Sequence, residues 1–132
     1  MATFQKFNQF VEDLAKGVHN LSTGQLKVAL TNTAPVAANS VYADLTSPLA
    51  TTNLSGATPF NVTTTSAEQT SGTLSLVLVD LTLTATGSVG PFRYVVLYND
   101  TPTSPADPLI GWYDYGSSVT MANTETFLID FA

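Results

Sequence analysis

Residues 92–99 read FRYVVLYN, and after a turn region rich in proline residues 109–115 read LIGWYDY. Side chains in each stretch alternate with a period of two, which is the periodicity of a β-strand. In the first stretch both alternating sets are largely apolar, as is typical of a central strand covered on both faces. The two stretches therefore predict the middle of a β-sheet, around which the rest of the chain is placed.

Further strands are expected on both sides of this centre. Leucine and valine alternate with more polar residues over 25–32, which predicts one strand. Residues 72–85 carry leucines in one phase before Val79-Asp80 and in the opposite phase after it, so a bulge or sharp bend is expected there. Two short strands, over 119–122 and 126–131, are expected to be joined by a hairpin loop.

The first 20 residues predict a helix. Apolar side chains recur there at spacings of three and four, which places them on one helical face. They are Phe4, Phe7, Phe10 or Val11, Leu14 and Val18. This face either packs on the sheet, which is the commoner arrangement, or docks on a partner subunit.

A long loop is expected over residues 33–71, which are rich in Ala, Thr, Ser, Asn and Pro and carry only two charges. A short strand or turn near 41–45 and a strand near 60–65 stay open within it. Loops of this length are usually functional or disordered. An uncharged loop dotted with apolar residues is expected to pack either on its own domain or on a neighbouring subunit.

The fold class that follows is mainly β, an antiparallel β-sandwich or barrel-like domain with an N-terminal α-helix. The 132 residues are expected to form one domain. The helix would span 1–20 and the β domain 25–132, with the long loop inside it.

Composition excludes several classes of function. Four Lys and Arg against ten Asp and Glu give a net charge of −6, which argues against a nucleic-acid partner. The absence of cysteine excludes disulfides and thiolate metal sites. No apolar run approaches the ~20 residues of a membrane span, so no membrane partner is expected.

The residues that could carry catalysis are few. Asp100, Asp107 and Asp114 lie near one another in the sequence and could do acid–base work or bind calcium, but prolines and threonines separate them. Turn formation is the favoured role for Asp100. His19 is expected to complement the dipole of the helix as a cation at its C-terminal end. The expectation is a protein that is not an enzyme and has no cofactor and no metal.

Two aromatic-rich stretches are candidates for interaction. Arg93 is the only arginine and alternates with aromatic residues, so it is expected to pair with an acid or to stack on a ring, within the chain or across a subunit interface. Trp112, Tyr113 and Tyr115 cluster on one strand. They either fill the core, the role favoured for Trp112, or form an exposed platform for a sugar ring or a protein interface.

Three strings of residues resemble a known family when taken together: LKVALTNTAP at 26–35, GPFRYVVLYNDT at 90–101 and DPLIGWYDYGSS at 107–118. They resemble small virion proteins of tailed bacteriophages, the capsid decoration or cement proteins. The resemblance covers most of the chain and is weakest over 42–71. It implies a protein assembled in the host cytoplasm that sits on the outer capsid surface. There it would clamp neighbouring subunits of the major capsid protein, often as a homotrimer.

The alternative is a structural protein of the phage tail or fibre that binds a host surface glycan through exposed aromatic residues with adjacent acids such as Asp114. For a decoration protein, contacts with the capsid or with other copies are expected from the helix, the long loop and the two aromatic strands. The residues expected to make these contacts are Phe4, Phe7, Val11, Pro35, Tyr42, Arg93, Trp112 and Tyr113.

Overall fold

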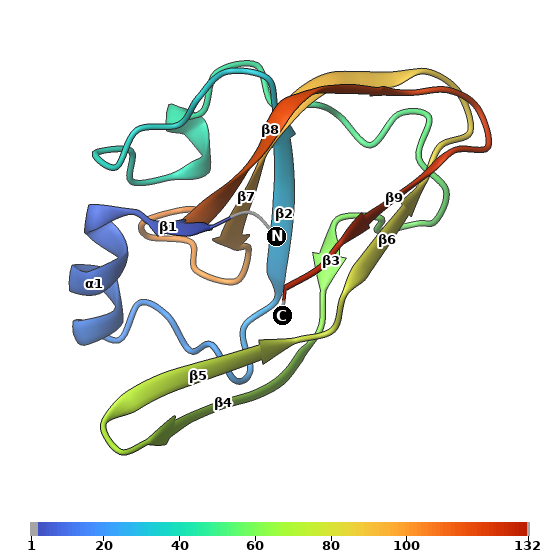
Figure 1. The fold of residues 1–132 in the computed structure, drawn as a ribbon. Coiled ribbons are helices and arrows are strands. Elements are labelled where there is room, and N and C mark those ends of the chain that lie inside the picture. Colours follow the sequence, from blue (N-terminus) through green and yellow to red (C-terminus); the bar gives the residue numbers. More distant parts are fainter. Residues whose placement is uncertain (1–2, 132) are drawn as a thin grey trace.

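The structure, a computed structural model, describes residues 3–131 and is mainly β, with antiparallel sheets and one short α-helix near the N-terminus (Figure 1). This confirms the predicted fold class. Within residues 3–131 the strands form three open sheets and no closed barrel.

The largest sheet has five strands, and residues 92–99 and 109–115 lie in two adjacent strands at its middle. In spatial order its strands are β1 (Phe4–Lys6), β8 (Leu109–Met121), β7 (Val89–Asn99), β2 (Leu26–Thr31) and β3 (Asn61–Val62). All neighbours are antiparallel. β7 is therefore central, as predicted.

Two smaller sheets of two strands complete the fold. β4 (Thr64–Thr70) and β5 (Thr73–Leu78) form a hairpin arm, and β6 (Leu81–Thr84) pairs with β9 (Thr126–Ile129). The one α-helix, α1, spans Asn8–Ala15. A 3-10 helix, η1, spans Tyr42–Asp44.

The five-stranded sheet separates two apolar cores, because β7 is apolar on both faces. Val95 and Leu97 face the larger core, which also contains Leu83 of β6 and Ile129 of β9. Val96 and Tyr98 face a smaller core on the other side, which contains Phe7. Alternate side chains of a strand point to opposite faces, so a strand with two apolar sets needs both faces covered.

The break predicted at Val79-Asp80 is confirmed. β5 ends before it and pairs with β4, whereas β6 begins after it and pairs with β9. The Asp80 side chain caps the end of β9 by accepting a hydrogen bond from the backbone N–H of Phe131 at 3.0 Å. Because the break inserts a change of phase, Leu76 and Leu78 of β5 pack on the same larger core as Leu81 and Leu83 of β6.

The predicted helix over 1–20 is wrong in its extent and in its face. Phe4 lies on β1 and pairs with Tyr113 of β8, and Phe7 stands at the helix N-cap with its side chain fully buried. Val11 is 57% exposed, so it does not face the core. The spacing of three and four is compatible with a helix, but the edge of β8 offers backbone hydrogen bonds that fix residues 4–6 as a strand instead.

Two further expectations need correction. Residues 33–71 are not one continuous loop: η1 forms the turn left open near 41–45, β3 forms the strand left open near 60–65, and β4 continues the β-structure to Thr70. The last strand does not form a hairpin with the strand before it: β9 pairs with β6, from a distant part of the sequence. Short-range turn signals predicted a local partner, whereas burial of Ile129 in the larger core favours the distant one.

A substitution at Gly111 tests the packing of β1 on β8. A Cβ at this position would lie 2.5 Å from the backbone oxygen of Gln5 and would also clash with the Phe4 ring. Gly111→Ala is therefore expected to push β1 away and to lower the free energy of unfolding by about 1–3 kcal/mol, measured by denaturant titration. Ser117→Ala, at an exposed position of the same strand, is the control and should stay within ~0.5 kcal/mol of the native protein. Equal stability of the two variants would contradict the close packing.

Candidate functional site

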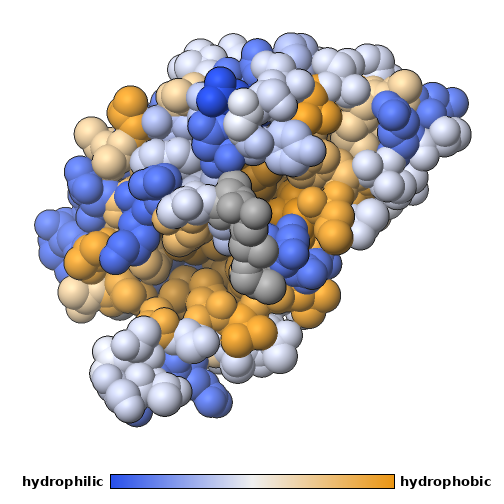
Figure 2. All heavy atoms as spheres, viewed as in Figure 1, coloured by the Kyte–Doolittle hydropathy of each residue, from blue (hydrophilic) through white to orange (hydrophobic). Residues whose placement is uncertain are grey.

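An apolar groove of about 540 Å³, which we call the hairpin groove, lies beside the hairpin arm. Phe4 and Leu14 form one wall, and Leu74, Leu76 and Leu78 of the hairpin arm form the other. Leu97 and Ile110 of the large sheet also line it. Figure 2 shows this apolar surface as the orange area between the projecting arm and the rest of the molecule.

The hairpin arm is held in shape by its turn. Ser71 and Gly72 both have positive φ, 52° and 82°, which is the geometry of a two-residue type I′ turn. Among the described residues 3–131, the strands of the arm pair only with each other. An isolated two-stranded hairpin is marginally stable in water, so the position of the arm depends on its leucines packing against the protein.

The walls of the hairpin groove are partly exposed to solvent. Leu74 is 46% exposed, and Phe4 and Leu14 are each 37% exposed. Of the residues that line the groove, Lys6 alone carries a charge. An apolar hollow of this kind offers little to a charged ligand and favours an apolar one.

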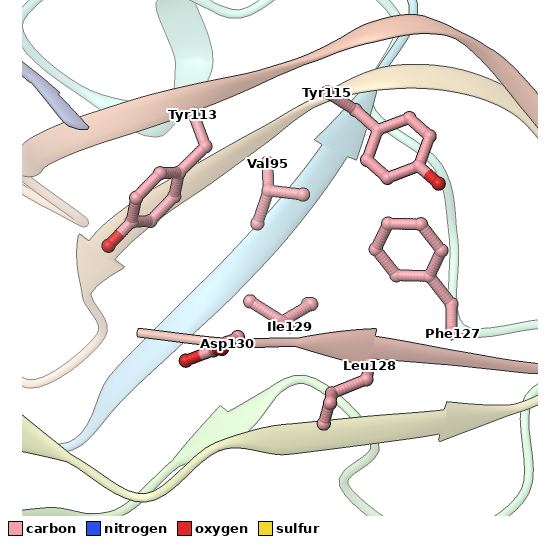
Figure 3. A pocket seen from close by; sticks show the side chains of 7 residues that line it. All are labelled: Val95, Tyr113, Tyr115, Phe127, Leu128, Ile129 and Asp130. Atoms are coloured by element: carbon pink, nitrogen blue, oxygen red, sulfur yellow. The ribbon is translucent and has the colours of Figure 1, made fainter. Parts of the chain in front are cut away.

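A smaller hollow of about 270 Å³, which we call the tyrosine pocket, adjoins the groove. Tyr113 and Tyr115 of β8 line it together with Phe127 and Asp130 (Figure 3). The rings of Tyr115 and Phe127 lie 5.2 Å apart between centroids. Burial, with a smaller effect of the Asp130 charge, raises the pKa of Tyr113, so this phenol stays protonated at neutral pH. Tyr113 lines both hollows.

The structure brings two of the predicted contact residues together. The rings of Phe4 and Tyr113 lie 5.1 Å apart between centroids, and both side chains line the hairpin groove. Val11 is exposed on α1 but does not line the groove. The prediction that these residues contact a partner remains a prediction.

Other predicted contact residues lie inside the protein. The structure corrects the prediction that Phe7 and Pro35 contact a partner, because both side chains are buried by the chain itself. Trp112 packs on Phe7 with 4.6 Å between ring centroids, which agrees with its favoured role in the core. Tyr42 is half-buried and packs on Tyr98 at 5.0 Å. The sheet face that carries Trp112 is opposite to that of Tyr113, so these two do not form one aromatic platform.

Arg93 has both of the partners that the sequence suggested. Its Nε and Nη2 donate to the two carboxylate oxygens of Asp114 at 2.8 and 3.1 Å. Its guanidinium also lies 5.4 Å from the centre of the Tyr94 ring. The hydrogen bond from Arg93 lowers the pKa of Asp114. The pair is well over a third exposed, so it contributes little to stability, and it remains open to a partner.

The three acids singled out in the sequence do not form one site. Asp114 forms an ion pair with Arg93, whereas Oδ2 of Asp100 lies 3.2 Å from Nζ of Lys27. Burial and a hydrogen bond to Asp100 raise the pKa of Asp107. Across residues 3–131 no group of three or more His, Cys, Asp or Glu side chains is arranged to hold a metal ion.

Sequence reasoning missed the arm wall of the groove. Leu74, Leu76 and Leu78 were recognised as one phase of a strand, but the groove that they line was not predicted. The strand pattern alone could not identify it, because Phe4 and Leu14 of the opposite wall lie far away in the sequence. Phe127 and Asp130 were missed because their pocket is completed by a distant strand.

His19 differs from its predicted role. It lies beyond the end of α1, is 6% exposed, and its Nδ1 is 3.2 Å from the side-chain nitrogen of Asn99. Burial lowers the pKa of His19, against a smaller opposing effect of Asp13. A neutral imidazole at neutral pH replaces the predicted cation at the helix end.

The pH dependence of stability tests this assignment. A base whose pKa is lowered by folding contributes stability above its unfolded pKa of about 6.5, and the contribution is lost as the pH falls below that value. The native protein should therefore lose more unfolding free energy between pH 7 and pH 5 than His19→Gln, which keeps an acceptor for Asn99. Denaturant titrations at the two pH values measure this difference. A larger loss in the variant would show that His19 binds its proton more tightly when folded.

Comparison with family models, with curated proteins and with solved structures found no match for this chain. None of the helices described in residues 3–131 has the length and apolar character to cross a membrane.

Proposed function

We propose that this protein is a capsid decoration, or cement, protein that binds the outer surface of a phage head and stabilises contacts between major capsid subunits. The observation that supports this best is the hairpin groove. Its walls include leucine and phenylalanine side chains that stay open to solvent, with Leu74 46% and Phe4 37% exposed. A surface of this kind gains free energy when another protein covers it.

The location of the exposed apolar residues also favours an interaction protein. Phe4 and Leu14 lie far in the sequence from Leu74, Leu76 and Leu78, yet both sets of side chains line the same groove. The outer face of the arm is more polar, since Val77 shares it with Thr73 and Ser75 of β5 and with Glu68 of β4. Several modest contacts add up when they are made together on one shell.

Charge supports the outer rather than the inner surface of the shell. With a net charge of −6 the protein would be repelled by packaged DNA. Three of the four positive side chains already form ion pairs with acids of the same chain: Lys16 with Glu12, Lys27 with Asp100 and Arg93 with Asp114. The homotrimer implied by the family resemblance is part of the same proposal.

Binding to empty shells tests the proposal. The purified protein is expected to cosediment with expanded capsid shells assembled without it, and cryo-electron microscopy should place its density on their outer surface. Leu74→Lys puts a charge on the groove wall and should weaken binding by about tenfold or more. Val77→Lys makes the same change of charge on the opposite face of the arm at nearly equal exposure, and is the matched control.

Three other outcomes would count against parts of this proposal. If Leu74→Lys and Val77→Lys bind equally well, the groove is not the contact surface. If only Val77→Lys is impaired, the outer face of the arm makes the contact. If the native protein fails to bind shells and its density is found on the tail, the decoration proposal is wrong.

The tyrosine pocket supports a second candidate, a tail- or fibre-associated protein that binds a host surface glycan. Tyr115 is 55% exposed in the pocket that Asp130 also lines, and an aromatic ring and an acid in one pocket suit a sugar. In that case the protein should bind purified surface polysaccharide of the host, and Tyr115→Ala should reduce binding by about tenfold or more in titration calorimetry. Ser117→Ala is the control on the same strand. The lack of polysaccharide binding by the native protein would exclude this candidate.

A further inference from the structure

The free edge of β5 faces the hairpin groove. Thr70 and Thr73 flank the two-residue turn and form a hydrogen-bonded pair, so the backbone groups of Thr73, Ser75 and Val77 point towards β4. Val79 continues this set, because its N–H donates to the backbone oxygen of Thr63 at 2.9 Å.

The backbone groups of the alternate residues point the other way. Leu74, Leu76 and Leu78 direct both their N–H and C=O groups towards the edge that no strand occupies. Among residues 3–131 no backbone hydrogen bond joins this edge to another segment. The same three residues place their side chains in the groove, so the groove offers backbone hydrogen bonds and apolar surface together.

This vacant position continues the line of β9. Ala85 directs its backbone groups to the β9 side, since it donates to Glu125 and accepts from Thr124, both at 2.8 Å. Along a strand, residues whose side chains point to one face also direct their N–H and C=O groups towards one edge. The inward-facing residues of β5 and of β6 therefore direct these groups towards the same edge of the continuous strand pair. β9 occupies that edge beside β6, and β4 lies on the opposite edge beside β5 (Figure 1).

The edge also lacks the features that protect natural edge strands. Residues 73–79 read TLSLVLV, with no charge and no proline. The two edges of the large sheet are protected by length, since β1 has three residues and β3 has two. β5 offers a longer, uncharged edge, and its groove face is apolar.

We propose that β5 accepts an extended, uncharged segment of the capsid protein as an added strand, running antiparallel to it as β9 does beside β6. The segment would carry apolar side chains at alternate positions and span about five residues, at ~3.3 Å each. This inference rests on the proposed function and names how the same groove binds its partner.

The shape of the groove favours another protein's extended segment over a second copy of β5. The free edge of β5 lies at the arm wall of the groove, and Phe4 and Leu14 form the wall opposite to it. A second copy would carry the same walls around its own β5, so two such edges meet only if both walls are displaced. A single extended strand needs no such displacement, and it satisfies the free backbone groups of Leu74, Leu76 and Leu78.

Hydrogen exchange at single amides tests the proposal. The protein is bound to expanded shells assembled without it, exchanged in D₂O for a fixed time, released into a quenching solvent and read by NMR. The amides of Leu74, Leu76 and Leu78 should exchange at least about tenfold more slowly when bound than when free. The amides of Ser75 and Val77, already bonded to β4, should change much less.

A pair of variants at one position separates the backbone from the side chain. Leu76→Pro removes the N–H that points to the free edge and leaves the bonds between β5 and β4, whereas Leu76→Ala shortens the side chain and keeps the N–H. Leu76→Pro should bind shells at least about tenfold more weakly than Leu76→Ala. Continued protection of the Ser75 and Val77 amides shows that the arm is folded in both variants.

The outcomes distinguish this inference from the function on which it rests. If the protein binds shells but exchange at Leu74, Leu76 and Leu78 is unchanged, strand addition is wrong and the decoration proposal stands. If these amides are protected in the protein alone and it sediments as a dimer, the edge belongs to a second copy and the inference is overturned. If the protein does not bind shells, the proposed function fails and the inference fails with it.

Discussion

The burial of β7 on both faces is the constraint on which the rest of the structure depends. Val95 and Leu97 on one side and Val96 and Tyr98 on the other each need an apolar cover. The N-terminal segment and the region of η1 supply one cover, and β6 with β9 supplies the other. The strands β4 and β5 extend beyond the core that β6 and β9 complete, and they contact it through inner side chains such as Ala67, Leu76 and Leu78. Their projection as an arm, and the groove beneath it, follow from the way the central strand is buried.

The sequence predicted the elements whose signals are local. The alternation in 92–99, the leucine phases and the break at Val79-Asp80 all depend on neighbours within a few residues, and the structure confirms them. The strand at Phe4 and the pairing of β9 with β6 depend on partners more than 40 residues away, which alternation does not reveal. The candidate site was harder still, because its walls are brought together only by the completed fold.

The molecule combines a rigid sheet with a lightly attached arm. Gly111 allows β1 to lie close to β8, so the Phe4 wall of the groove is fixed to the large sheet. The opposite wall belongs to a hairpin whose strands pair only with each other. One wall therefore belongs to the large sheet, whereas the other is joined to the rest of the fold at Val79-Asp80 and by the packing of Leu76 and Leu78. A strand added beside β5, as proposed above, would leave the large sheet unchanged.

The uncharged sequence of β5 has a consequence for the protein before it finds a partner. TLSLVLV combines high β-propensity with low charge and no proline, which is the composition of segments that stack into cross-β fibrils. While the groove is empty, the arm and the walls beside it are the main barrier to such stacking. Thermal opening of the arm would expose the segment without unfolding either core. Under the proposed function, the time that a newly made copy spends without a strand beside β5 sets its risk of fibril formation.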